Sequence, residues 1–99
     1  MTVKIQSVHF DADKKLLDFI NERVEKLTHF YDGILRCDVT LRLDKSSDSE
    51  NKITEIQLHI AGNDLFAKRQ CKTFEEALDT CLDALKTQLK KHKEKIKGM

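Results

Sequence analysis

At 99 residues, the chain is long enough for one compact domain and too short for two. Its apolar residues, 39% of the total, come in short runs broken by charges, which excludes a transmembrane segment and a secretory signal peptide. The three cysteines cannot all pair in disulfides and match no zinc-ligand spacing, so we expect reduced thiols in a cytoplasmic protein. They are Cys37, Cys71 and Cys81.

The net charge of +1 hides an uneven distribution of charge along the chain. Residues 86–99 contain six lysines and one glutamate, for a net charge of +5. Residues 1–85 contain 12 basic and 16 acidic residues, for a net charge of −4. An acidic body with a basic C-terminal segment is typical of a protein that has a polyanionic partner.

The N-terminal third of the chain predicts one strand and one helix. Apolar and polar residues alternate from Val3 onward, which predicts a strand over residues 2–9. Asp11 or Asp13 can then cap a helix whose apolar residues recur every three or four positions. We expect this helix to continue to about residue 29 or 30 and to be ended by Gly33.

A second strand is predicted by strict alternation of apolar and polar residues, which gives it one buried and one solvated face. Its expected buried residues are Cys37, Val39, Leu41 and Leu43. Residues 44–51 form a polar loop, and alternation resumes in a third strand that ends near Ile60.

The third and fourth strands are predicted to form a hairpin. Gly62 and Asn63 suit the two central positions of its turn, because both residue types tolerate a positive φ. This register keeps apolar residues opposite one another on one face of the sheet. The predicted pairs are Ile60 with Leu65 and Leu58 with Ala67.

The last helix is predicted to begin at a capping box, in which the Thr73 hydroxyl accepts from the amide of Glu76. It continues to about residues 95–97, with an apolar stripe along one side. The stripe contains Phe74, Leu78, Cys81, Leu82, Leu85, Leu89, His92 and Ile96.

The order β-α-β-β-β-α predicts an α+β fold. Two amphipathic helices are available to cover one face of a four-stranded mixed sheet. A right-handed crossover makes the first two strands parallel, and the remaining strands form an antiparallel meander.

The sequence offers no candidate for catalysis. Its three glycines are isolated and form no phosphate-binding loop, and its four histidines fall on different elements without ligand spacing. The strand pattern points Cys37 into the core, where a thiol is inert. We therefore expect a protein that is not an enzyme and that has no metal, no cofactor and no small-molecule substrate.

The lysines of the last helix are the strongest functional signal. Lys86, Lys90, Lys93 and Lys97 lie on one flank of the apolar stripe, and Lys91 and Lys95 lie on the other. Such rows suit contacts with phosphates that do not depend on base sequence. A solvated helix end is the structural alternative, since the helix dipole favours lysines there.

Of three other binding modes that the residues could suggest, two are disfavoured and one remains an alternative. The solvated face of the sheet carries one aromatic residue, Phe66, which is too little for a base-stacking platform. A membrane surface is disfavoured because the last helix has no tryptophan and needs its apolar side for the sheet. An acidic partner protein that docks on the basic helix remains the alternative to RNA.

Several stretches in this order resemble the short ribosome hibernation promoting factors and the related ribosome-associated inhibitor, Y factor, of the sigma-54 modulation protein family. Residues 88–95, which read Gln-Leu-Lys-Lys-His-Lys-Glu-Lys, are the most specific match. Residues 23–27 (Arg-Val-Glu-Lys-Leu) and 77–79 (Ala-Leu-Asp) also match, and the resemblance extends over residues 2–97.

This resemblance implies a fold like that of double-stranded-RNA-binding domains and a protein that inhibits translation in stationary or starved cells. Its partner would be ribosomal RNA of the small subunit, in the channel that messenger and transfer RNA occupy, with no DNA or membrane partner. The family's basic surface involves both helices, and it maps onto Arg23, Lys26, Lys90, Lys91 and Lys93 here.

The lysine rows and the resemblance together predict one set of RNA-binding residues. The set is Arg23, Lys26, Lys86, Lys90, Lys91, Lys93, Lys95 and Lys97.

The chain departs from the family pattern near the start of the last helix. The usual Asp-Met-Tyr-Ala-Ala-Ile-Asp reads Thr-Phe-Glu-Glu-Ala-Leu-Asp over residues 73–79, and two expected bases become Ala84 and Thr87. Lys86 stands at a usually acidic position, and His29 stands where a lysine is common. These differences move the expected basic surface toward the C-terminal end of the helix.

The resemblance also implies a domain organisation. We expect residues 1–99 to form a single ribosome-binding domain, without the C-terminal dimerisation domain of the long factors or the acidic tail of Y factor.

Overall fold

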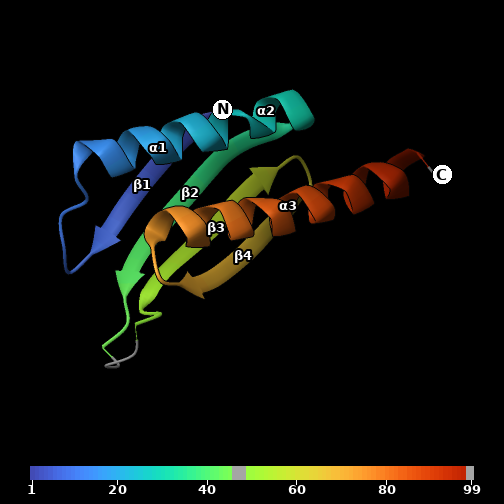
Figure 1. The fold of residues 1–99 in the computed structure, drawn as a ribbon. Coiled ribbons are helices and arrows are strands. Elements are labelled where there is room, and N and C mark those ends of the chain that lie inside the picture. Colours follow the sequence, from blue (N-terminus) through green and yellow to red (C-terminus); the bar gives the residue numbers. More distant parts are fainter. Residues whose placement is uncertain (46–48, 98–99) are drawn as a thin grey trace.

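The computed structural model describes residues 1–45 and 49–97, with side chains as far as Glu94 (Figure 1). The centre of the expected polar loop and the side chains of Lys95, Ile96 and Lys97 therefore lie outside the described part. The elements are β1 (Thr2–Val8), α1 (Lys14–Glu25), α2 (Leu27–Phe30), β2 (Ile34–Leu43), β3 (Lys52–Ile60), β4 (Asn63–Cys71) and α3 (Phe74–Lys97).

The strands form one four-stranded sheet in the order β1-β2-β3-β4. β1 pairs with β2 in parallel, and β2–β3 and β3–β4 are antiparallel, which confirms the predicted mixed sheet. Both long helices cover the same face and run in the same direction, α1 on the β1 side and α3 over β3 and β4 (Figure 1). The opposite face of the sheet is left uncovered.

The core lies between this sheet and the two long helices. Apolar side chains alternate along the strands, as predicted, and meet the apolar stripes of α1 and α3. The fully buried members are Ile20, Val24, Leu27, Cys37, Leu41, Ile56, Leu58, Leu78, Cys81, Leu85 and Leu89.

The first predicted helix is in fact two helices that meet at Lys26. Asp13 caps α1 as one of the two predicted caps, and its Oδ1 accepts from the Leu16 amide at 2.8 Å. The Thr28 hydroxyl donates to the Glu25 carbonyl at 2.6 Å, while the His29 amide donates to the Lys26 carbonyl. At this break, the His29 amide bonds to residue 26 rather than to residue 25, the partner it would have in a regular α-helix.

Gly33 does not end a helix, contrary to the prediction. α2 ends at Phe30, and Tyr31 already has an extended backbone. The glycine serves close packing instead, because a Cβ atom at this position would lie 2.7 Å from the Tyr31 ring. The requirement for glycine therefore comes from a neighbouring side chain.

The predicted hairpin register is wrong by two residues. The turn is Ala61-Gly62, with Gly62 at a φ of +79°, and Ile60 pairs with Asn63. The apolar pairs are Leu58 with Leu65 and Ile56 with Ala67. A two-residue shift preserves the face of every side chain, so the predicted buried face of the hairpin is still correct.

Leu43 was predicted to be buried and is 41% exposed. It is the last residue of β2 and pairs with Lys52, at the end of the strands that extends beyond the helices (Figure 1). Alternation places Leu43 on the correct face, but no helix covers that end of the sheet.

The β3 residue Thr54 is polar and fully buried, and among the described residues its Oγ1 has no hydrogen-bond partner. An unpaired buried hydroxyl costs about 1–3 kcal/mol, and valine has nearly the same shape. We therefore expect Thr54→Val to raise the free energy of unfolding by about 1 kcal/mol, measured by urea denaturation. Thr54→Ser keeps the unpaired hydroxyl and loses a buried methyl group, so it should lower the free energy of unfolding. A lower free energy of unfolding in Thr54→Val would contradict the expectation.

Candidate nucleic-acid interface

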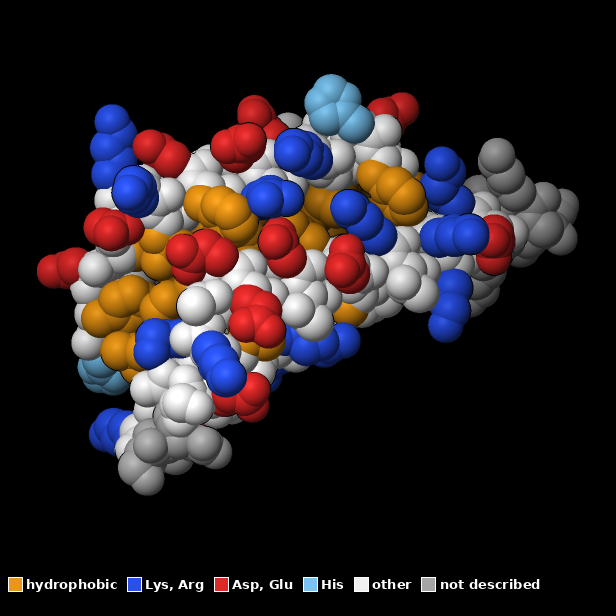
Figure 2. Space-filling view, viewed as in Figure 1, with side chains coloured by type: hydrophobic (Ala, Val, Ile, Leu, Met, Phe, Trp, Pro, Cys, Tyr) orange, Lys and Arg blue, Asp and Glu red, His pale blue; other side chains and the backbone are white. Residues whose placement is uncertain are grey.

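Helix α3 separates its charges along its length. Every charged residue from Glu75 to Asp83 is acidic, and from Lys86 onward every charged residue except Glu94 is basic. The acidic half lies at the N-terminus and the basic half at the C-terminus, where the helix dipole favours each. Figure 2 shows the same division on the helix-covered face, with lysine and arginine side chains gathered around the C-terminal end of α3.

The basic end of α3 projects past the sheet (Figure 1). Leu89 is the last fully buried residue of the described helix, and Lys90, Lys91 and Lys93 are all exposed. His92 is half-buried, with its ring 6.1 Å from the Tyr31 ring, centroid to centroid, in an edge-on contact. The core thus anchors the helix while its lysines reach solvent on several sides.

The predicted residues of α1 do meet α3. Arg23 and Lys26 line a recess of about 240 Å³ between the two helices, opposite Lys86. The remaining lining residues are Asp79, Leu82 and Asp83. The fold therefore brings three of the predicted basic residues together, although they come from positions about sixty residues apart.

Arg23 is held by contacts within the protein, which the sequence analysis did not foresee. Its Nε lies 4.0 Å from Oδ1 of Asp79, and its guanidinium lies 4.8 Å from the centroid of the Phe19 ring. Asp79 thus offsets part of its charge. Within the described part of the chain, Lys26 and the lysines of α3 make no such ion pair, so their charges are the more available ones.

A second recess, of about 400 Å³, lies at the corner between α2 and β2. Its lining residues are His29, Phe30, Tyr31, Asp32, Gly33 and Lys93. Of these, only Lys93 belongs to the RNA-binding residues predicted from the sequence. The two neighbouring aromatic residues after the first helix were the available signal, but their approach to α3 depends on tertiary structure.

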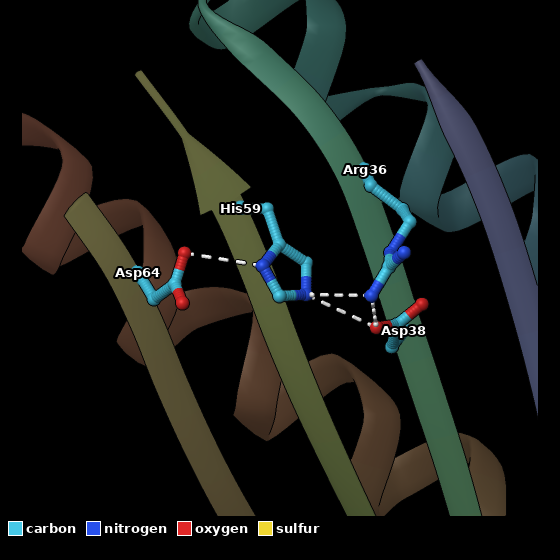
Figure 3. A network of polar contacts seen from close by, with 4 residues as sticks. All are labelled: Arg36, Asp38, His59 and Asp64. Atoms are coloured by element: carbon cyan, nitrogen blue, oxygen red, sulfur yellow. Dashed lines mark hydrogen bonds and ion pairs between the residues drawn. The ribbon is translucent and has the colours of Figure 1, made fainter. Parts of the chain in front are cut away.

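The uncovered face of the sheet carries a polar network that also escaped prediction (Figure 3). The two ring nitrogens of His59 on β3 face carboxylates on both sides: Nε2 lies 3.0 Å from Asp38 on β2, and Nδ1 lies 3.1 Å from Asp64 on β4. Arg36 donates to the same Asp38 oxygen at 2.9 Å. Strand register explains the cluster, since Arg36 pairs with His59 and His59 pairs with Asp64.

Charges on this uncovered face largely neutralise one another. Besides the His59 network, Arg42 donates to Glu55 across β2 and β3 at 2.8 Å. Phe66 is 53% exposed there, in the position predicted for it. Lys4 and Lys68 also face this side and make no ion pair within the described part of the chain, but they lie on β1 and β4, at opposite edges of the sheet. This face is therefore a poorer polyanion-binding surface than the continuous basic end of α3.

The His59 network predicts a pH dependence of stability. Burial by itself would raise the pKa of Asp38, but hydrogen bonds with His59 and Arg36 outweigh it, so the pKa lies below its ordinary value of 3.8. A carboxylate with a lowered pKa stabilises the folded state above its ordinary pKa, and this contribution is lost as the pH falls through the lowered value. We expect a contribution below about 1 kcal/mol, since exposed ion pairs rarely give more.

The measurement compares urea midpoints of the wild-type protein and Asp38→Asn between about pH 6 and about pH 3. Wild type should be the more stable at the upper pH, and the difference should shrink as the pH falls. A difference that stays constant or grows in acid would contradict this role of Asp38.

The buried cysteines are poor nucleophiles. Burial raises the pKa of the Cys37 thiol to about 12 and that of Cys81 to about 11. The Cys81 Sγ donates to the Thr54 carbonyl at 3.2 Å. All three cysteines are free, and Cys71 is half-buried. Cys37 and Cys81 therefore act as core residues.

Two further findings concern the described residues only. They include no group of three or more His, Cys, Asp and Glu side chains placed to hold a metal ion. None of the described helices combines the length and the apolar character needed to cross a membrane.

Comparison with known sequences finds relatives over the whole chain. A family model described as sigma 54 modulation protein / S30EA ribosomal protein matches residues 3–97. A protein named ribosome hibernation promoting factor from Azotobacter vinelandii is 32% identical over 95 residues, which are 96% of this chain and 85% of the relative. A protein of the same name from Pseudomonas putida is 30% identical over 99 residues, which are 100% of this chain and 93% of the relative. Another from Klebsiella oxytoca is 28% identical over 97 residues, which are 98% of this chain and 98% of the relative.

Comparison with solved structures finds the same fold. A ribosomal subunit interface protein from Coxiella burnetii superposes with a TM-score of 0.83 at 17% identity, covering 94% of this chain and 98% of that one. The N-terminal domain of Protein Y from Thermus thermophilus superposes with a TM-score of 0.80 at 22% identity, covering 93% and 99%. Fold, sequence relatives and family match agree with the resemblance found in the residues, and the chain belongs to the sigma 54 modulation protein / S30EA ribosomal protein family.

Proposed function

We propose that this chain is a ribosome hibernation factor, a non-enzymatic protein that binds ribosomal RNA of the small subunit and inhibits translation in stressed or stationary cells. The single observation that carries the proposal is the basic end of α3, projecting beyond the core of a chain that belongs to this family. Its site of action is the channel for messenger and transfer RNA, in the cytoplasm where ribosomes work.

The arrangement of the two helices supports contact with RNA along one edge of the molecule. Lys26 and Lys86 lie at the recess between α1 and α3, and Lys93 lies at the recess between α2 and β2. Lys90 and Lys91 are exposed on the next turn of α3. We infer that these five lysines contact phosphates directly, while Arg23, paired with Asp79, contributes less.

The acidic residues near the start of both long helices restrict how the protein can approach RNA. Asp11, Asp13 and Glu75 line a recess at the end of the helix layer opposite the lysines of α3, together with one basic residue, Lys15. The three carboxylates outnumber the one lysine of this recess, so the recess on balance repels phosphates, and indiscriminate coating of nucleic acid is disfavoured. A shaped site that accepts the basic end and leaves the acidic end in solvent, such as a channel, fits this polarity.

Sedimentation with purified ribosomal subunits tests the proposal. We expect the protein to pellet with small subunits at low salt, to be released at raised salt, and to inhibit a cell-free translation reaction. Failure to bind small subunits at low salt would overturn the proposal.

A pull-down from cell lysate, with and without ribonuclease, separates RNA from the alternative partner. If the ribosomal proteins recovered with this chain disappear after ribonuclease treatment, RNA carries the interaction. A partner protein that stays bound after treatment would favour the protein-interaction module instead.

A further inference from the structure

The recess at the corner between α2 and β2 contains features that phosphate binding alone does not explain. We call it the aromatic recess and define it by His29, Phe30, Tyr31, Asp32, Gly33 and Lys93. Its volume of about 400 Å³ is enough for one nucleobase and part of its sugar. Most of it comes from a short segment after α1, and Lys93 comes from the projecting end of α3.

One wall of the aromatic recess is held in place. The Tyr31 ring lies so close to Gly33 that a Cβ atom there would be 2.7 Å from Tyr31 Cε2. The ring also makes an edge-on contact with His92 of α3, with 6.1 Å between the ring centroids. Tyr31 is therefore positioned before any ligand arrives, which lowers the entropy cost of stacking on it.

Phe30 is exposed beside this wall. It is 38% exposed although it is a large apolar side chain at the end of a helix. Lys93 and His29, which line the same recess, are also exposed. An exposed ring next to a solvated cation is the combination that proteins use to bind single-stranded nucleic acid, with bases on the ring and phosphates on the cation.

We propose that the aromatic recess binds one unpaired nucleobase of RNA, stacked against Phe30 and Tyr31, with the adjoining phosphate on Lys93. This inference rests on the proposed function and adds to it a contact with a base. The Asp32 carboxylate also lines the recess and repels phosphate, so the phosphate must lie toward Lys93. The same carboxylate can accept a hydrogen bond from an exocyclic amino group, which favours cytosine, adenine or guanine over uracil.

The chain provides its own probe for this contact. It contains one tyrosine and no tryptophan, so the tyrosine emission of the isolated protein reports on Tyr31 alone. We expect an RNA octamer of alternating cytidine and adenosine to quench this emission in a saturable manner at low salt. Inorganic polyphosphate of matched charge should bind the lysines and leave the emission unchanged, because it has no base to stack.

Two substitutions test the recess without removing a charge. Phe30→Ala should weaken octamer binding by about 5- to 150-fold, the usual effect of losing one stacked base, and Phe30→Tyr should restore it. Gly33→Ala should displace the Tyr31 ring and reduce the quenching, and this second variant keeps the test valid if Phe30→Ala folds poorly. Phe66→Ala, at an exposed ring on the uncovered face of the sheet, is the matched control and should bind like wild type.

The results separate this inference from the proposed function. Equal changes in emission with octamer and polyphosphate, or wild-type affinity in both Phe30→Ala and Gly33→Ala, would overturn the base contact. If the protein still pelleted with small subunits in that case, the proposed function would stand without it. Quenching by the octamer, together with no binding to small subunits, would overturn the proposed function and leave the base-binding recess in place.

Discussion

Replacement of Lys90, Lys91 and Lys93 by glutamate is expected to weaken binding to small ribosomal subunits by about 100- to 1,000-fold at 0.1 M salt. Each phosphate contact releases condensed counterions from the RNA. Losing one contact therefore lowers the logarithm of the binding constant by about 0.9 at that salt concentration. All three side chains are exposed on the projecting end of α3, and within the described chain they have no ion-pair partner to lose.

The salt dependence distinguishes this effect from misfolding. Six to eight phosphate contacts give a slope of log affinity against log salt of roughly −5 to −7 for wild type, and the triple variant should lose about three units of slope. Lys14, Lys15 and Lys72 provide a matched control, because they are exposed near the N-terminal ends of α1 and α3. Their replacement by glutamate changes the net charge equally and should cost far less affinity.

Equal losses in the two triple variants would mean that net charge alone governs binding and that the basic end of α3 has no special role. Unchanged binding in the first variant would remove these three lysines from the interface. A triple arginine variant at positions 90, 91 and 93 should keep both the affinity and the slope, since it keeps the charges.

Leu85→Ala is expected to destabilise the fold by about 2–5 kcal/mol, the usual cost of truncating a buried leucine. Leu85 is fully buried where α3 packs over β3 and β4. For a domain of this size the loss corresponds to a melting temperature at least about 8 °C lower, measured by circular dichroism. Because α3 carries the lysines, its loosening should also weaken binding to small subunits at temperatures near the new melting point.

Leu35→Ala is the control for this substitution. Leu35 is the same residue type, but it is 62% exposed at the irregularity near the start of β2. Its truncation should change the free energy of unfolding by no more than about 0.5 kcal/mol. Similar losses at Leu85 and Leu35 would contradict the described packing of α3 on the sheet.

Local patterns predicted most of the secondary structure, because each depends on residues close together in the chain. Alternation located the strands, and the Thr73 capping box located the start of α3, where the Glu76 amide donates to the Thr73 hydroxyl at 3.1 Å. The helix break at Lys26 was missed because the apolar spacing of the predicted helix continues through it to Leu27. The hairpin register was missed because two turns of the same length suited the same glycine.

In the candidate site, too, the features that lie within one helix could be predicted from the sequence, and the features that join several elements could not. The lysine rows of α3 are a property of one helix, so the spacing of the residues predicted them. The pairing of Arg23 with Asp79 joins two helices, and the His59 network joins three strands, so neither had a local signal. The aromatic recess likewise needs Lys93 to come close to Tyr31 across more than sixty positions of the chain.

Fold class, core faces and charge polarity can be predicted from the residues alone, because periodicity and composition are local quantities. The order of charged residues along the chain already shows an acidic body and a basic helix end, although the net charge is only +1. Which charges are neutralised and which remain available depends on how the helices and the sheet pack together. Ion pairs and recesses form between side chains that the packing of helices on the sheet brings together. The distances between such side chains cannot be predicted from the spacing of residues along a single helix or strand.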